Sequence, residues 1–86
     1  MALVKITPLE ARVRWDRRRA RPTSIRIGNR QLTVTALDAV RDETAAYPAH
    51  RGPRTTYLLE TDGGQASLVF DARRRRWYVE ALDTAA

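Results

Sequence analysis

The sequence predicts an all-β domain, built as a six-stranded antiparallel meander that forms a small barrel or a strongly curled sheet. Three observations predict this class. Apolar and polar residues alternate along most of the chain, β-branched and aromatic residues are frequent in the alternating segments, and turn residues separate those segments. With 86 residues the chain is expected to form one domain, residues 1–86, with an ordered core from residue 8 to residue 83.

Alternation defines three strands in the first half of the chain, expected over Leu9–Asp16, Ile25–Ile27 and Leu32–Ala36. In the first hairpin, the register that brings large apolar residues together pairs Val13 with Ile25. In the second hairpin, a turn at Asn29-Arg30 pairs Ile27 with Leu32. The same faces of the strands therefore point toward a common core.

The second half of the chain repeats this pattern in strands expected over Thr55–Thr61, Ala66–Asp71 and Trp77–Ala81. A two-residue turn at Gly63-Gly64 pairs Leu59 with Leu68. A four-residue loop, Ala72–Arg75, then pairs Leu68 with Val79. Large apolar residues again meet on one face, as strand register requires.

Two segments leave an alternative open. Thr7-Pro8-Leu9-Glu10 matches a helical capping box with proline at the first helical position, so a helix over Pro8–Ala20 competes with the first strand. Arg17 would interrupt the apolar stripe of this helix, which favours the strand. Alternation also slips at Ala36-Leu37, and this slip predicts either a bulge or, over Leu37–Thr44, a short helical turn.

The positive charge is concentrated in two arginine runs. The net charge is +6, and arginine supplies 15 of the 16 basic residues. Alternate connections of a meander lie at the same end, which places Asp16–Thr23, Asp42–Arg54 and Asp71–Arg76 together. The first and third connections carry +3 each and the second is neutral, so this end accounts for the whole net charge. Such an asymmetric field would attract an anionic partner.

These runs and the tryptophans beside them predict a nucleic-acid-binding surface, because guanidinium groups bind phosphates and aromatic rings stack on bases. The candidate residues are Trp15, Arg17, Arg18, Arg19, Arg21, Arg73, Arg74, Arg75, Arg76 and Trp77. His50, in the longest connection, is a further candidate. Other interpretations stay open: the arginine usage of a GC-rich genome, solubility and the protection of strand edges, and burial of both tryptophans at the rim of the core.

The predicted register also produces an apolar row on the outer face of the sheet, formed by Leu58, Val69 and Tyr78. An exposed row of this kind predicts a contact surface for a partner protein or for a second copy of the chain in a homodimer. Alternatively, the amino-terminal segment Leu3–Ile6, or Leu82 and the tail, folds over the row.

The sequence gives no basis for catalysis, a cofactor or a metal site. It contains one histidine and no cysteine, and Ser24 and Ser67 lack a base that could activate them. Asp62-Gly63-Gly64 lacks the alternating carboxylates of a calcium loop. No apolar stretch approaches the roughly 18 residues of a membrane span and no signal-peptide pattern is found, so we expect a cytoplasmic protein that is not an enzyme.

The order of these signals is similar to that of a short, functionally uncharacterised bacterial all-β domain family. The motifs that carry the resemblance span most of Pro8–Asp83 and are Pro8-Leu9-Glu10, Arg21-Pro22, Gly28-Asn29-Arg30, Arg54-Thr55-Thr56-Tyr57 and Arg76-Trp77-Tyr78-Val79-Glu80. Members stand alone in high-GC bacteria, and some are associated with Y-family translesion DNA polymerases. The resemblance implies an accessory role in DNA transactions. Family members have aromatics where this chain has Ile25-Arg26-Ile27 and Ala45-Ala46-Tyr47-Pro48, which implies an altered binding surface.

Overall fold

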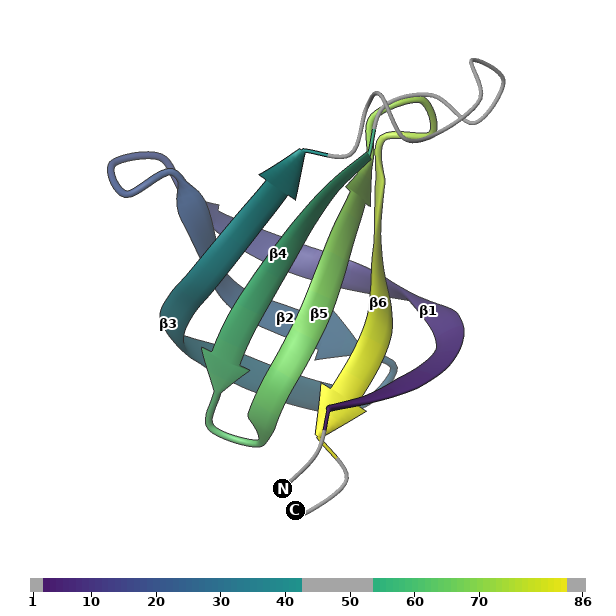
Figure 1. Cartoon of the computed structure of the whole chain (residues 1–86). Coiled ribbons are helices and arrows are strands. Elements are labelled where there is room, and N and C mark those ends of the chain that lie inside the picture. Colours follow the sequence, from purple (N-terminus) through teal and green to yellow (C-terminus); the bar gives the residue numbers. More distant parts are fainter. Residues whose placement is uncertain (1–2, 43–53, 84–86) are drawn as a thin grey trace.

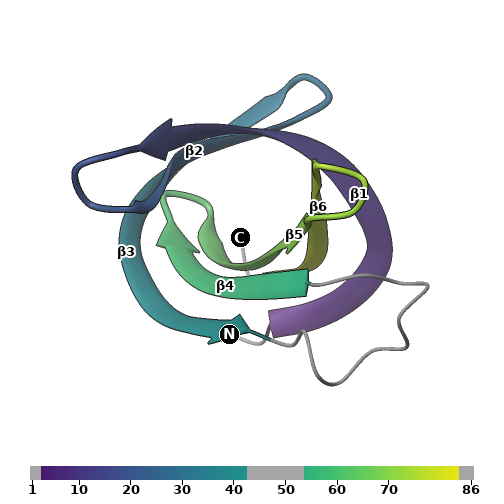
Figure 2. The same ribbon diagram turned by 90° about the horizontal axis from the view of Figure 1, so that it is seen from above.

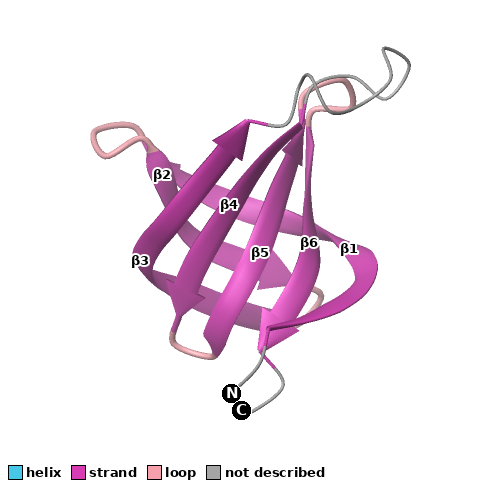
Figure 3. Ribbon diagram, in the orientation of Figure 1, coloured by secondary structure: helices cyan, strands magenta, loops and turns pink. Residues whose placement is uncertain are grey.

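Six antiparallel strands close into a barrel (Figure 1). The computed structural model describes residues 3–42 and 54–83, which form strands and turns and no helix (Figure 3). The strands are β1 (Leu3–Asp16), β2 (Arg21–Ile27), β3 (Arg30–Asp42), β4 (Arg54–Thr61), β5 (Gly64–Asp71) and β6 (Arg76–Asp83). Each strand pairs with its neighbours in the chain, and β1 also pairs with β6. The predicted fold class is confirmed, and of its two forms the chain adopts the barrel.

Strand β1 is long because it pairs with two other strands, β2 and β6. Its second part, from Arg12 to Asp16, pairs with β2, and its first part, from Leu3 to Ala11, pairs with β6. The β1–β6 register shifts between Lys5 and Leu9, where Pro8 has no N–H to donate. The proline segment is therefore an irregularity within a strand, and the alternative helix over residues 8–20 is wrong.

Strand β3 is divided in the same way, since it pairs first with β2 and then with β4. Its register against β4 shifts between Val34 and Ala36 and again between Leu37 and Ala39, which confirms the predicted bulge. The alternative helical turn is wrong over residues 37–42, because the strand continues to Asp42; residues 43 and 44 lie outside the described residues.

The core lies inside the barrel and receives side chains from all six strands. Its central cluster of buried residues is Ala11, Ile25, Leu32, Val34, Leu59, Leu68 and Val79. Val13 pairs with Ile25, and Leu68 pairs with Val79, as the sequence predicts. Because successive strand residues point to opposite faces, the alternation in the sequence selects the residues that fill the interior.

The turn between β4 and β5 lies at Asp62-Gly63, one residue before the predicted position. The predicted pairing of Leu59 with Leu68 is therefore wrong, and Leu59 pairs with Ala66. Asp62 is held in the turn by β3: its N–H donates to the Thr33 carbonyl (3.0 Å), and its carboxylate accepts from the Thr33 N–H (3.0 Å). The register moves by two residues, an even number, so the predicted inward faces are retained.

The turn between β2 and β3 shows the same displacement, because it lies at Gly28-Asn29 instead of Asn29-Arg30. Ile25 pairs with Leu32, and the predicted pair of Ile27 with Leu32 is wrong. Gly28 has a φ of +59°, the conformation that the first central residue of a primed hairpin turn requires. Glycine meets this requirement at low cost, which fixes the turn at Gly28.

The two terminal segments are paired with each other. Leu3, Val4 and Lys5 pair with the end of β6, and Ile6 and Leu82 pack against the core. Leu3–Ile6 and Leu82 therefore do not fold over the outer face of β5, and that part of the alternative is wrong; the tail, residues 84–86, lies outside the described residues. This pairing completes the closure of the barrel.

Candidate nucleic-acid interface

Four aromatic side chains form a cluster that we call the aromatic rim: Trp15, Tyr57, Phe70 and Trp77. The ring of Trp15 lies 5.9 Å from the rings of both Tyr57 and Trp77, and Trp77 lies 4.8 Å from Phe70, measured between ring centroids. Tyr57 and Trp77 pack against the core, and burial raises the pKa of Tyr57. Trp15 remains 39% exposed, so one face of the rim reaches the surface.

The two arginine runs form turns of the same construction, which we call the arginine turns: Asp16–Arg21 and Asp71–Arg76. In each turn, the aspartate at its start pairs across the hairpin with the arginine at its end, and four residues lie between them. The Asp16 carboxylate accepts hydrogen bonds from the N–H groups of Arg18 (2.9 Å) and Arg19 (3.3 Å). The Asp71 carboxylate does the same for the second and third residues after it, at 3.0 and 3.1 Å.

The likeness extends to the backbone. The fifth residue of each turn, Ala20 in one and Arg75 in the other, has a positive φ, of 52° and 55°. A left-handed conformation costs a residue with a side chain roughly 1 kcal/mol or more, and here it returns the chain to the next strand. Both turns share the spacing Asp-x-Arg-Arg-x-Arg. The sequence reasoning found the arginines but missed this spacing, which would have predicted two equivalent turns.

The arginine turns lie at the same end of the barrel, as predicted, but on opposite sides of it (Figures 1 and 2). The prediction that the two arginine-rich connections lie together at this end is therefore wrong. The reason lies in the register: Trp77 pairs with Ala11, and β1 continues for five residues before it turns after Asp16. At about 3.3 Å per residue, this carries the first turn about 16 Å beyond the point where β6 meets β1. Trp15 and Trp77, the strand residues next to the two turns, are still in contact with each other.

Three arginines that the sequence reasoning did not select occupy the outer face between the turns. Arg12 and Arg14 lie on β1, and Arg26 on β2 pairs directly with Arg12. All three are exposed. The charge count missed them because it treated the rest of the chain as neutral, while balancing carboxylates such as Asp38 and Glu60 lie on β3 and β4. The predicted pairing of Val13 with Ile25 already implied this juxtaposition, because it places the next residues, 12 and 26, opposite each other.

The expected apolar row on the outer face is not an exposed surface. Val69 is only 1% exposed, whereas Leu58 and Tyr78 are half-buried. Arg54 on β4 forms an ion pair with Glu80 on β6, so the pair spans the outer face of β5. An arginine side chain that crosses this face can cover apolar surface with its aliphatic part.

Other kinds of site find no support in the described part of the chain. Residues 3–42 and 54–83 contain no group of three or more His, Asp or Glu side chains arranged to hold a metal ion. The same ranges include no helix with the length and apolar character needed to cross a bilayer. His50 and the 43–53 connection lie outside the described residues.

Comparison with known proteins gives no relative for this chain. No protein-family model matches it, and neither a curated protein nor a solved structure is significantly similar to it.

Proposed function

We propose that this barrel is a non-catalytic cytoplasmic module that binds nucleic acid through the arginine turns and the aromatic rim. The observation that carries the proposal is their arrangement: two equivalently built turns present seven exposed arginines at one end of the barrel, on either side of the rim that contains Trp15. Arginine binds phosphate through a planar fork of donors, and tryptophan stacks on bases of any sequence. The family resemblance favours an accessory role in DNA transactions.

Hydrogen bonds within the turns support a binding role rather than a merely solvated loop. The aspartates fix the backbone of each turn, so the arginines project from a defined frame. Of the turn guanidiniums, that of Arg19 lies 4.0 Å from Asp16, and that of Arg76 contacts Glu10. Positive charge that is carried on a defined backbone and only partly neutralised is suited to releasing counterions from a phosphate backbone.

We expect fluorescence-anisotropy titrations with oligonucleotides to show an affinity that falls linearly with the logarithm of salt concentration. Replacing Arg18 and Arg73 together with glutamine should reduce the slope by about 1.5, because each lost phosphate contact removes about 0.7–0.9. The charge-matched control is Arg30→Gln with Arg41→Gln, two exposed residues outside both turns. This control should retain most of the slope.

Two results would contradict the proposal. One is the absence of binding at tens of micromolar protein and low salt, for single-stranded and double-stranded DNA and RNA alike. The other is an equal loss in the turn variant and in the charge-matched control, which would show attraction by net charge alone. Comparing single-stranded with double-stranded probes also tests the rim, because stacking on Trp15 requires unpaired bases.

Self-association through Leu58, Val69 and Tyr78 is the alternative that the sequence predicts. A partner could contact only the exposed parts of Leu58 and Tyr78, because Val69 is buried. Light scattering of the wild type and of Tyr78→Arg tests this alternative. A dimer that dissociates in the variant would establish it, and a monomer in both proteins would exclude it.

A further inference from the structure

Three arginines from three different strands form a lateral row on the outer face of the barrel. Arg12 on β1 pairs directly with Arg26 on β2. On the other side of β1, the pairing of Ala11 with Trp77 places Arg76, the preceding residue of β6, opposite Arg12. Side chains at directly opposed positions have Cβ atoms about 5 Å apart, and like charges in such positions destabilise a sheet. A row of three arginines therefore acts against folding stability.

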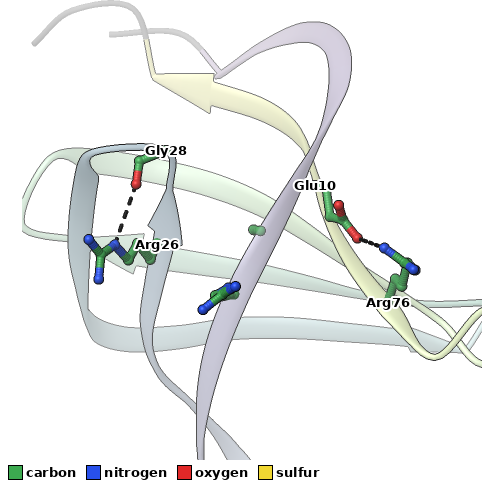
Figure 4. A pocket seen from close by; sticks show the side chains of 6 residues that line it. Glu10, Arg26, Gly28 and Arg76 are labelled. Atoms are coloured by element: carbon green, nitrogen blue, oxygen red, sulfur yellow. Dashed lines mark hydrogen bonds and ion pairs between the residues drawn. The ribbon is translucent and has the colours of Figure 1, made fainter.

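The charge of this row is only partly neutralised. Glu10 forms an ion pair with Arg76 and holds the pKa of that guanidinium above its usual value by hydrogen bonding and by its charge. Arg26 donates through Nε to the Gly28 carbonyl at 3.4 Å, an uncharged acceptor (Figure 4). Among the described residues, the guanidinium of Arg12 has neither a hydrogen bond nor an ion pair. Within residues 3–42 and 54–83, the carboxylate of Glu10 is thus the one negative charge paired with this row of three arginines.

The row lies beside a hollow in the surface. Strand β1 pairs with β2 from Arg12 to Asp16 and with β6 from Leu3 to Ala11. The hollow at the fork where these two pairings separate has a volume of about 600 Å³. Its lining consists of Glu10, Ala11, Arg12, Arg26, Gly28 and Arg76. An adjoining hollow of about 380 Å³ shares Arg12 and Arg26 and adds the side chain of Arg14. A group bound at the fork would therefore lie among arginines from three strands.

We infer that the row Arg26–Arg12–Arg76 is a subsite for a backbone phosphodiester of the nucleic acid bound by this protein. The inference rests on the proposed function and adds the flank of the barrel to the arginine turns. Arg76 belongs to one turn, and Arg12 and Arg14 continue along β1 toward the other. From residue 10 to residue 16, β1 spans about 20 Å, which equals the rise of about six base pairs along the axis of a duplex. A phosphate at the row relieves the repulsion among the three cations, and Glu10 competes with it for Arg76.

The test compares Arg12→Gln with Arg41→Gln, which removes the same charge from an exposed position on β3 outside the row and outside both turns. Anisotropy is measured at several salt concentrations with oligonucleotides that carry a 5′-hydroxyl. Arg12→Gln should reduce the salt slope by about 0.7–0.9, the value for one phosphate contact, and Arg41→Gln should leave it nearly unchanged. Glu10→Gln should raise the affinity several-fold, because it frees Arg76 for the phosphate.

The outcomes separate this inference from the proposed function. Binding by the wild type with equal slopes in Arg12→Gln and Arg41→Gln would overturn the inference alone. Absence of binding by the wild type would overturn both. An effect of Arg12→Gln that appears only with a 5′-phosphorylated oligonucleotide would overturn the phosphodiester assignment and identify a terminal phosphate as the ligand. A loss of affinity in Glu10→Gln would likewise contradict the competition between Glu10 and phosphate.

Discussion

Gly64 follows the turn between β4 and β5 with a φ of +105°, a conformation that residues with side chains rarely adopt. A Cβ atom built on Gly64 would lie 2.7 Å from the Cβ of Asp83, which is closer than real Cβ contacts. Backbone conformation and space therefore both require glycine at this position.

Replacing Gly64 with alanine should lower the free energy of unfolding by about 1–3 kcal/mol, because strain in φ and steric overlap act together. Gly28→Ala is the matched control. Gly28 also has a positive φ, of +59°, but a Cβ there meets nothing within 4 Å. Urea denaturation should show a clearly smaller loss for Gly28→Ala. Equal losses would mean that the backbone conformation alone sets the cost.

Single residues also explain why the arginine turns were only half predicted. Their charge is visible in the sequence as consecutive arginines, but their shape depends on Asp16 and Asp71, each of which binds two backbone N–H groups. Aspartate commonly fixes turns in this way, so the signal was present. It was missed because each aspartate was counted as a negative charge rather than as the residue that shapes its turn.

At the scale of neighbouring strands, β3 and β4 carry a pair of carboxyl groups. A hydrogen bond with Asp38 raises the pKa of Glu60, and the charge of Asp38 and partial desolvation add to the increase. The folded state therefore holds the proton more tightly than the unfolded state does. The contribution of this pair to the free energy of unfolding is fully present below the pKa that Glu60 has in the unfolded state. It is lost as pH rises through the higher pKa that Glu60 has in the folded state.

Glu60→Gln should therefore be stabilising at pH 7 and should have a smaller effect near pH 4, where the pair of the wild type retains its proton. Thermal melts of both proteins at the two pH values measure this difference in Tm. Asp38→Asn is the control, because removing either partner should abolish the same contribution. A Tm difference that is larger at pH 4 than at pH 7 would contradict the assignment.

Hairpin registers show how far pattern reasoning reaches at this scale. The register between β5 and β6 was predicted correctly, since Leu68 pairs with Val79. The two turns that contain glycine, β2–β3 and β4–β5, were each predicted one residue late, and Gly28 and Asp62 set their actual positions. Alternation could not detect these errors, because a displacement by two residues leaves the same side chains on the inner face.

The whole molecule combines a closed barrel with an uneven distribution of charge. The net charge is +6; the arginine turns lie at one end of the barrel (Figure 1), and further arginines lie on β1 and β2, while Asp38 and Glu60 lie on β3 and β4. Ion pairs among the described residues join Arg19 to Asp16, Arg54 to Glu80 and Arg76 to Glu10. Repulsion among the remaining arginines should therefore outweigh these attractions.

Sodium chloride should consequently raise the Tm of the wild type between 0.1 M and 1 M, because the screening length falls from about 10 Å to about 3 Å. Arg12→Gln should show a smaller rise, since it removes the central charge of the arginine row. Differential scanning calorimetry without nucleic acid measures both proteins. A Tm that falls with salt would show that the ion pairs dominate the electrostatics of the fold.

The sequence by itself determined the number of strands from Leu9 onward, the faces that fill the core and the charge of the two connections, because these depend on local alternation and composition. Only the tertiary structure decided how those parts meet. Barrel closure divides β1 between β2 and β6, and this division brings Arg76 beside Arg12 and sends the arginine turns to opposite sides. Val69 is also buried in the tertiary structure, although alternation assigns its face to solvent. Strand period is a local property, whereas the bulges and pairings that close the barrel join residues far apart in the chain.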